Sequence, residues 1–220
     1  MKLIVEELTQ DQVQFLTEAT KDGKGKDYYL TGVFMTAEDV NKNGRKYPKH
    51  ILENEVGRYN NQYVMAHRAF GELCHTAVPT IDLTRVSHLI ESLHFQGNNV
   101  IGKAKILDTP YGKIVKAFID EGAQLGVSTR GVGSLVEQNG VKIVQEDFKL
   151  ATAADIVHDP SAYNALVQGI MEQKEWLYED GVWREADIES ARKAIKNASK
   201  VNLVETQIQV FEKFMNVLKG

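Results

Sequence analysis

The sequence has little of three things that would mark a specialised class of protein. A single cysteine, Cys74, in 220 residues excludes a disulfide within the chain and fits a reducing compartment. The net charge of −4 leaves no basic excess of the kind that general nucleic-acid binding needs. No apolar run is long enough to cross a bilayer, and the N-terminal MKLIVEELTQDQ meets acidic residues too early for a secretory signal. We therefore expect a soluble intracellular protein that binds neither membrane nor nucleic acid.

What the sequence does have is an ordinary globular composition, with 43% hydrophobic and 25% charged residues. A chain of this length can bury a core without metals or disulfides. Up to about residue 160, β-branched and aromatic segments alternate with short helical patterns. The expected elements are a helix over 10–21, a strand over 28–37, a helix after Pro48, a hairpin of 85–95 and 100–107, a helix opened by Pro110, and a hairpin made from 127–136 and 141–157. These segments predict an α+β fold on a closed or strongly bent antiparallel sheet.

The character of the chain changes after Pro160. The Asp-Gly pair at 180–181 predicts a small hairpin. From Glu185 onward, apolar residues recur at three- and four-residue spacing, as in a helical packing seam. We interpret 1–175 as the main domain and 176–220 as a helical C-terminal extension, which packs on its own domain or makes a homo-oligomer or partner contact.

Two short motifs contain residues suited to nucleophilic catalysis. GELCH ends in His75, and histidine is the usual general base near neutral pH. GVSTRGVGS at 126–134 places Ser128 among glycines, which let backbone N–H groups approach a substrate oxyanion. This motif matches neither an α/β-hydrolase elbow nor a phosphate-binding Walker loop. Each motif alone also fits a structural histidine or a glycine-rich bend between core strands.

A third motif, TAADIVHDPSA at 152–162, contains Asp155 in an otherwise apolar strand. A carboxylate is costly to bury there unless it is paired, and an imidazolium would be a suitable partner. That is the role of the third member of a Ser-His-Asp triad. The alternative is a charge at the rim of a sheet, bound to backbone amides or water.

In this order, four motifs resemble those of the prohead core proteases of large contractile-tailed phages: NKNGRKYP, GELCH, GVSTRGVGS and DIVHDPSA. The resemblance runs from about residue 28 to 175, so 1–175 is expected to be the protease domain. It implies Ser128 as nucleophile, His75 as base and Asp155 as the third triad member. His158, and less strongly Glu72, are rivals of Asp155 for the third place.

The resemblance also implies a fold and a reaction. The family is similar to the herpesvirus maturation proteases, whose core is a bent, barrel-like antiparallel sheet ringed by helices. It implies a serine endopeptidase that needs no cofactor and no metal. Its partners would be its substrates, the phage scaffold and core proteins and the major capsid protein. These would be cut after glutamate inside the assembling prohead, in the host cytoplasm.

Supporting roles can be assigned to a few further residues. The backbone N–H groups of Arg130 and Gly131 are the expected oxyanion donors, and the Arg130 side chain is a candidate for recognising the substrate glutamate. The resemblance implies cleavage sites with an aliphatic residue two places before the glutamate and a small residue after it. Leu16-Thr17-Glu18-Ala19 has that form, so we expect self-cleavage between Glu18 and Ala19.

Two other functions remain open from the sequence. A metal-dependent hydrolase would use His67, Cys74 and His75, although adjacent Cys and His chelate poorly from a strand and no H-E-x-x-H or C-x-x-C pattern is present. A non-enzymatic capsid scaffold would associate through the C-terminal helices, although scaffolds are typically long-helical and this chain is rich in strands.

Overall fold

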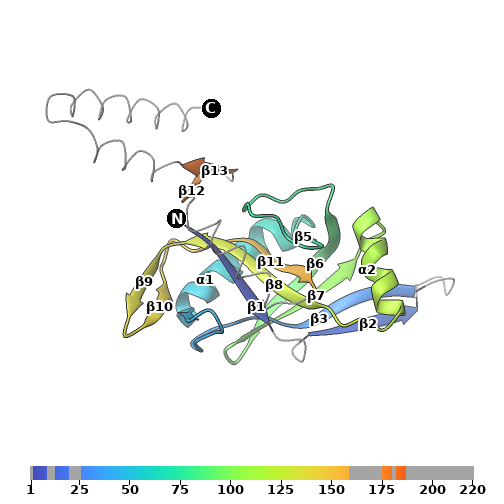
Figure 1. The fold of residues 1–220 in the computed structure, drawn as a ribbon, viewed down its shortest axis with the longest axis horizontal. Helices are drawn as coiled ribbons and strands as arrows, with labels where there is room; N and C mark the ends of the chain where they lie inside the picture. The colour runs from blue at the N-terminus through green and yellow to red at the C-terminus, as the bar shows by residue number, and fades with distance from the viewer. Residues whose placement is uncertain (1, 9–12, 20–25, 159–174, 180–181, 187–220) are drawn as a thin grey trace, which may run out of the picture.

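The structure, a computed structural model, describes residues 2–8, 13–19, 26–158, 175–179 and 182–186. These residues form mostly strands, with two α-helices and one π-helical turn (Figure 1). In chain order the elements are β1 (Lys2–Leu8), β2 (Val13–Ala19), β3 (Lys26–Thr36), β4 (Arg45–Lys46), α1 (Lys49–Tyr59), the π-helical η2 (Asn60–Val64), β5 (Phe70–Glu72), β6 (Val86–Gln96), β7 (Asn99–Ile106), α2 (Pro110–Asp120), β8 (Gly126–Gly133), β9 (Leu135–Gln138), β10 (Val141–Val144), β11 (Lys149–Val157), β12 (Glu175–Glu179) and β13 (Val182–Ala186). None of the described helices has both the length and the apolar character needed to cross a membrane.

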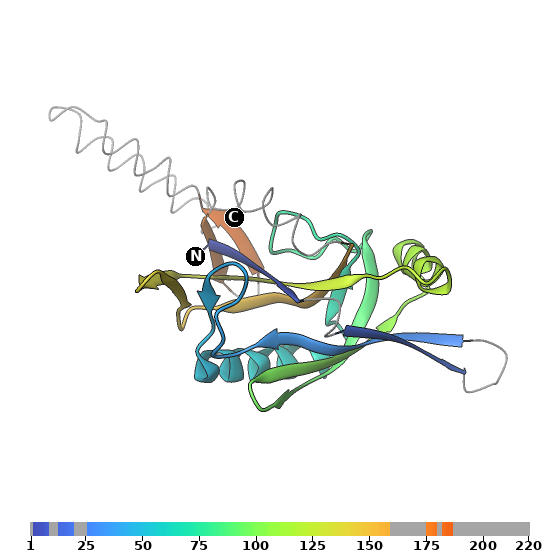
Figure 2. The same cartoon turned by 60° about the horizontal axis from the view of Figure 1, so that its bottom comes forward.

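The strands form three sheets. The first has the order β11-β8-β1-β12-β13, the second β2-β3-β7-β6-β5, and the third β4-β10-β9. In Figure 2 the first sheet lies over the second, and the main hydrophobic core takes side chains from both. Figure 1 shows the β9–β10 hairpin at one end of the molecule and α2 at the other. The first sheet contains two of the predicted site residues, Ser128 on β8 and Asp155 on β11.

The predicted barrel-like closure is not found among the described residues. The first sheet ends at β11 and the second at β5, and these edges meet through a parallel bridge between Leu73 and Ile156. This contact is a single bridge, in which the Cys74 N–H donates to the carbonyl of Ile156 at 2.8 Å, while the N–H of Leu73 donates to the carbonyl of Arg85 at 3.3 Å. The two α-helices of the described residues do not ring the sheets, since α1 packs on β11 and β6, and α2 on β6 and β7. The mixed class is therefore confirmed in its coarse form only.

The helix predicted over 10–21 is wrong, because this part of the chain contains strand β2. All seven residues of β2 pair with β3, from Val13 opposite Gly32 to Ala19 opposite Lys26. Phe15 packs on the core, while Glu18 lies exposed and contacts Lys103 at 3.3 Å. The local sequence suits a helix, but pairing with β3 stabilises the segment as a strand.

The turns of both hairpins were predicted correctly, since their signals are local. The strands expected over 127–136 and 141–157 are each divided in two, into β8 and β9 and into β10 and β11. β6 and β7 pair across the turn containing Gly97, whose φ is +66°. β9 and β10 pair across Asn139 and Gly140, which both have positive φ, as a two-residue type I′ turn requires. Helix α2 begins as expected, with the Thr109 hydroxyl accepting the N–H of Gly112 at 3.0 Å.

The boundary between the two predicted parts of the chain falls inside the first sheet. β12 pairs with β1 through Lys2 and Glu175, and β13 pairs with β12, as predicted for a hairpin around 180–181. The described residues of 176–220 are thus strands. The helices expected after residue 186 lie outside the described residues.

Gly71 provides a direct test of the packing between the sheets. A Cβ atom there would lie 2.1 Å from Nε2 of His88 and 2.3 Å from the carbonyl oxygen of Ala154. Gly71→Ala should therefore destabilise the fold by about 3 kcal/mol, as overpacking of a rigid site does. Gly57→Ala on α1 is the matched control. It meets no atom within 4 Å and should stabilise the helix by about 0.5–1 kcal/mol in urea unfolding. Equal stabilities of the two variants would contradict this packing.

Candidate active site

Ser128 and His75, 53 residues apart in sequence, meet in the interior. Ser128 lies on β8 between β1 and β11, and its hydroxyl oxygen is 3.4 Å from Nε2 of His75. The distance is long for a hydrogen bond, as is common at catalytic sites without substrate. Neighbouring Thr129 points to the opposite face, where its hydroxyl donates to the carbonyls of Phe34 and Ala153 at 2.9 Å. This alternation directs Ser128 away from the space between the sheets and toward His75.

His75 is presented by a sharply turned segment and not by a strand. β5 ends at Glu72, and Cys74 has a φ of +57°, which is uncommon for a residue with a side chain. The turn is held on both sides. The Cys74 N–H donates to the carbonyl of Ile156 at 2.8 Å, and Arg85 donates to the carbonyls of Leu73 at 2.9 Å and Cys74 at 2.6 Å. His75 thus follows a fixed backbone, which restricts where its ring can lie.

A β-bulge brings Asp155 to the same face as Ser128. Arg130 pairs with Thr152, and Ser128 pairs with Asp155, so β11 has one more residue than β8 over this stretch. Directly opposite residues of antiparallel strands point to the same face. Without the extra residue, Ala154 would lie opposite Ser128 and Asp155 would face the other side.

The carboxylate of Asp155 is completely buried, with one oxygen in a hydrogen bond and the other at ion-pair distance from Arg130. Oδ1 accepts the N–H of Glu72 at 2.8 Å, and Oδ2 lies 3.1 Å from Nε of Arg130. Burial raises the pKa of Asp155, while the charge of Arg130 and the Glu72 N–H oppose that change. The aspartate therefore acts on the segment before His75 and on Arg130, two contacts that the triad hypothesis does not include.

The rivals for the third place are found in different environments. His158 is exposed at the end of β11. Glu72 is completely buried, and its carboxylate lies 3.2 Å from Arg130. The turn at Cys74, whose φ is +57°, separates Glu72 from His75, so the two residues do not belong to one continuous strand. The sequence did not predict that Arg130, Glu72 and Asp155 form one buried group. Its only signal was a carboxylate in each of the motifs GELCH and TAADIVHDPSA.

The environment of His75 favours the neutral, proton-accepting imidazole. Burial, and after it the positive charge of Arg130, lowers the pKa of His75 to about 4, against the opposing effect of Glu72. A second buried histidine, His88, has a similarly lowered pKa of about 4 because of burial. Its Nε2 lies 3.0 Å from the carbonyl of Ala154 and must donate, so its Nδ1 accepts from the Ser87 hydroxyl at 2.9 Å. His88 has a structural role.

The glycines around Ser128 have a packing reason in addition to any catalytic one. A Cβ atom on Gly131 would lie 2.6 Å from the ring of Phe148, and one on Gly133 would lie 3.1 Å from the backbone of the same residue. Gly131 and Arg130 also sit inside a strand that is paired on both sides. The predicted oxyanion donors are therefore part of a sheet interior.

The residues named for a metal site differ in exposure. His67 is exposed, Cys74 is half-buried and His75 is buried. Across the part of the chain that the structure describes, histidine, cysteine, aspartate and glutamate form no group of three that could hold a metal ion.

Comparison with known proteins matches the same region. A sequence model of the family described as prohead core protein serine protease matches residues 5–175. The prohead core protein protease of Enterobacteria phage T4 is 43% identical over 142 residues, which are 63% of this chain and 67% of that protein. The solved structure of the bacteriophage T4 capsid assembly protease has a TM-score of 0.67 and 35% sequence identity, covering 72% of this chain and 98% of that chain. With Ser128, His75 and Asp155 all inside the matched range, the chain belongs to the prohead core protein serine protease family.

Proposed function

We propose that this chain is a serine endopeptidase that cuts scaffold, core and capsid proteins of a phage during maturation of its prohead. The observation that supports it most is the approach of the Ser128 hydroxyl to Nε2 of the buried His75, at 3.4 Å. The relatives named as a prohead core protein protease and a capsid assembly protease support the substrate class. The enzyme would act inside the assembling prohead, in the host cytoplasm. We also propose that its fold is similar to that of the herpesvirus maturation proteases.

The reaction uses side chains of this chain and water. The Ser128 oxygen attacks the scissile carbonyl while Nε2 of His75 takes the hydroxyl proton. The same proton passes to the leaving amine as the peptide bond breaks, which leaves an ester on Ser128. Water, deprotonated by His75, then hydrolyses the ester and restores the hydroxyl. Asp155 is the third member through its hold on Glu72 and Arg130, which fixes the segment that presents His75.

The oxyanion would be bound by backbone N–H groups beside Ser128. Between Leu150 and Thr152 the pairing of β11 with β8 shifts register, directly opposite Gly131 and Arg130. Ladder bonds are disrupted at such a shift, so an N–H of either residue has room to turn to a substrate. The Arg130 side chain is completely buried, and for that reason we do not propose it as the group that recognises the substrate glutamate.

The self-cleavage site between Glu18 and Ala19 lies on an exposed edge strand. β2 is the outermost strand of the second sheet, and both residues are exposed. Proteases bind extended backbone, and an edge strand offers it without disrupting a ladder on both sides. N-terminal sequencing of an active preparation should find a chain that begins at Ala19, and Glu18→Gln should block its formation. A mature N-terminus elsewhere would contradict this site.

The test of the function is intact mass after treatment with a fluorophosphonate. One adduct is expected on the wild type and on Ser134→Ala, a variant in the same motif, and none on Ser128→Ala. Since Ser128 is buried, the reaction should be run with and without scaffold or capsid protein. Folded wild type that takes no adduct under either condition would contradict the proposal.

The pH profile of activity should show a general base whose pKa is lower than that of an ordinary histidine. Only neutral imidazole accepts the serine proton, so activity falls as pH drops through the pKa of His75, which is about 4. We expect kcat/KM on a peptide substrate to stay nearly constant from pH 7.5 down to 5.5. A histidine with the ordinary pKa near 6.5 would lose activity about tenfold over that range. A tenfold loss in folded enzyme would show that His75 is not held as the structure has it.

A further inference from the structure

Arg130 is a buried cation on the same face of β8 as the nucleophile. It is the largest of the side chains that the described residues bury completely. Residues two apart on a strand share a face, so its guanidinium projects to the same side as the hydroxyl of Ser128. Burying an arginine is strongly unfavourable unless its charge is paired. The groups that the Arg130 guanidinium contacts therefore indicate the role of this side chain.

Two of those partners are completely buried carboxylates. Nη2 of Arg130 lies 3.2 Å from Oε1 of Glu72, and Nε lies 3.1 Å from Oδ2 of Asp155. These contacts have the distance of ion pairs without the angles of hydrogen bonds. Asp155 in turn accepts the backbone N–H of Glu72, so the three side chains join β5, β8 and β11 at one point.

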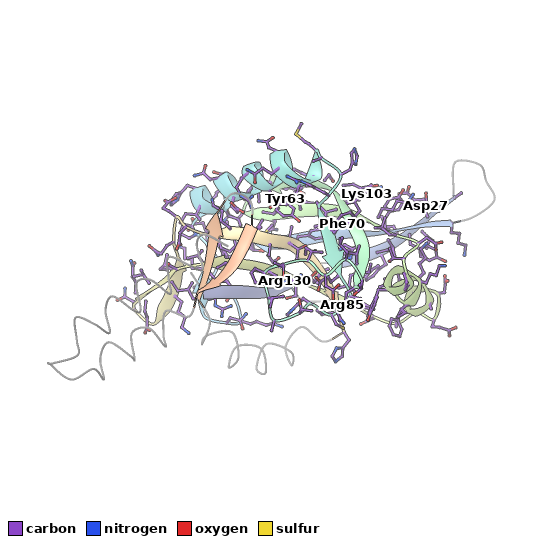
Figure 3. The ribbon with its side chains drawn as sticks, turned by 90° about the horizontal axis from the view of Figure 1, so that it is seen from above. Asp27, Tyr63, Phe70, Arg85, Lys103 and Arg130 are labelled. Atoms are coloured by element: carbon purple, nitrogen blue, oxygen red, sulfur yellow. The ribbon has the colours of Figure 1, made fainter. Side chains whose placement is uncertain are left out.

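The remaining nitrogen of the guanidinium is bound to the segment that follows His75. Nη1 donates to the carbonyl of Val78 at 2.6 Å and contacts the hydroxyl of Thr76 at 3.2 Å and the carbonyl of Thr80 at 3.4 Å. Glu72 binds the same segment, since its carboxylate accepts the N–H of Thr76 at 3.3 Å and that of Asp82 at 2.7 Å. Figure 3 labels Arg130 together with Arg85, which holds the carbonyls before His75.

We propose that Arg130, with Glu72, is a positioning residue that fastens both sides of the His75 segment to the strand of the nucleophile. The inference rests on the proposed function and adds to it how the base is held. His75 lies between Glu72 and Thr76, and both are bound to Arg130, whose own strand contains Ser128. A single buried group thus sets the distance between base and nucleophile. A pair of hydrophobic side chains would fill the same volume without fixing that distance.

The first part of the test is Arg130→Lys and Glu72→Gln. Lysine keeps the charge but cannot reach three directions, and glutamine places an amide N–H against one of the N–H groups that Glu72 accepts. We expect kcat to fall roughly a hundredfold, because small misplacements of catalytic groups have effects of that size, with KM changed less than about threefold.

A second ion pair, with a buried carboxylate and a partly exposed arginine, supplies the controls. Glu55 on α1 is almost completely buried, pairs with Arg58 and accepts the N–H of Leu150 at 2.6 Å. Glu55→Gln therefore makes the same chemical change at a similarly buried carboxylate, and Arg58→Lys makes it at an arginine that is less buried than Arg130. They should lower stability in urea unfolding while leaving kcat within about threefold of the wild type.

The pH profile separates positioning from general support of the fold. The charged groups beside His75 are Arg130 and Glu72, with Asp155 facing Arg130 and Arg85 binding the carbonyls before the ring. Arg130→Met removes the positive charge, so the acidic limb of kcat/KM should move to higher pH. Arg130→Lys should lose kcat and leave the limb in place. If Arg130→Met does not fold, the loss of kcat in Glu72→Gln, compared with Glu55→Gln, tests the positioning role.

The outcomes separate this inference from the proposed function. If wild type is labelled at Ser128, but Glu72→Gln and Arg130→Lys lose no more kcat than their controls, the positioning role is wrong and the protease stands. A raised KM at unchanged kcat would assign Arg130 to substrate binding and overturn the role as well. Wild type that is never labelled would remove the proposed function and this inference together.

Discussion

His75→Ala is expected to lower kcat on the order of 10⁵- to 10⁶-fold, as loss of the base does in serine proteases. His75 is the only base that the structure places against the Ser128 hydroxyl among the described residues, and burial keeps water from replacing it. The measurement is steady-state hydrolysis of a peptide substrate, together with the rate of fluorophosphonate labelling. His50→Ala is the matched control, since His50 is largely exposed and contacts Glu146, and it should leave both rates unchanged.

The double variant of Ser128 and His75 tests whether the two act as one unit. Ser128→Ala alone should lose as much activity as His75→Ala, and the double variant should lose no more than either. Residues that perform one step together show this lack of additivity. Additive losses would mean that the two side chains contribute separately, which the 3.4 Å contact does not lead one to expect.

Local features of this fold could be predicted from the sequence, and contacts between distant segments could not. The turn at Asn139 and Gly140 and the cap at Thr109 were foreseen because the signals lie within a few residues. Strand β2 was missed, because pairing with β3 and not its own residues makes it a strand. The sheet order and the open edges of β5 and β11 likewise depend on contacts far apart in sequence.

The site shows the same division. Motif chemistry named Ser128 and His75 only as candidates, since each motif also fits a structural reading, and the resemblance to a known family was needed to pair them. It was not enough to show that Asp155 and Glu72 share Arg130. A bulge in β11 creates that arrangement. Because β11 is buried on both faces, its sequence has no polar–apolar alternation from which an extra residue could be detected.

Asp155→Asn is expected to lose activity about 10³- to 10⁴-fold, comparable to the same change in a Ser-His-Asp triad. The substitution keeps the size of the side chain and replaces one oxygen by an amide group that can only donate. Oδ1 accepts the Glu72 N–H and Oδ2 faces Nε of Arg130, so either orientation of the amide sets two donors against each other. Breaking a buried pair in this way should also lower the free energy of unfolding by about 3 kcal/mol.

Stability and activity must be separated in that experiment, because Asp155 has a structural contact in addition to its proposed catalytic role. Asp147→Asn is the control, since Asp147 also accepts a backbone N–H, that of Ser134 at 2.9 Å, and lies outside the group around Arg130. We expect it to retain kcat/KM per folded molecule. If Asp155→Asn is destabilised but keeps its rate per folded molecule within tenfold, Asp155 only supports the fold. In that case Glu72, buried three residues before His75, becomes the stronger candidate for the third member, because exposed His158 lacks any such contact with the His75 segment among the described residues.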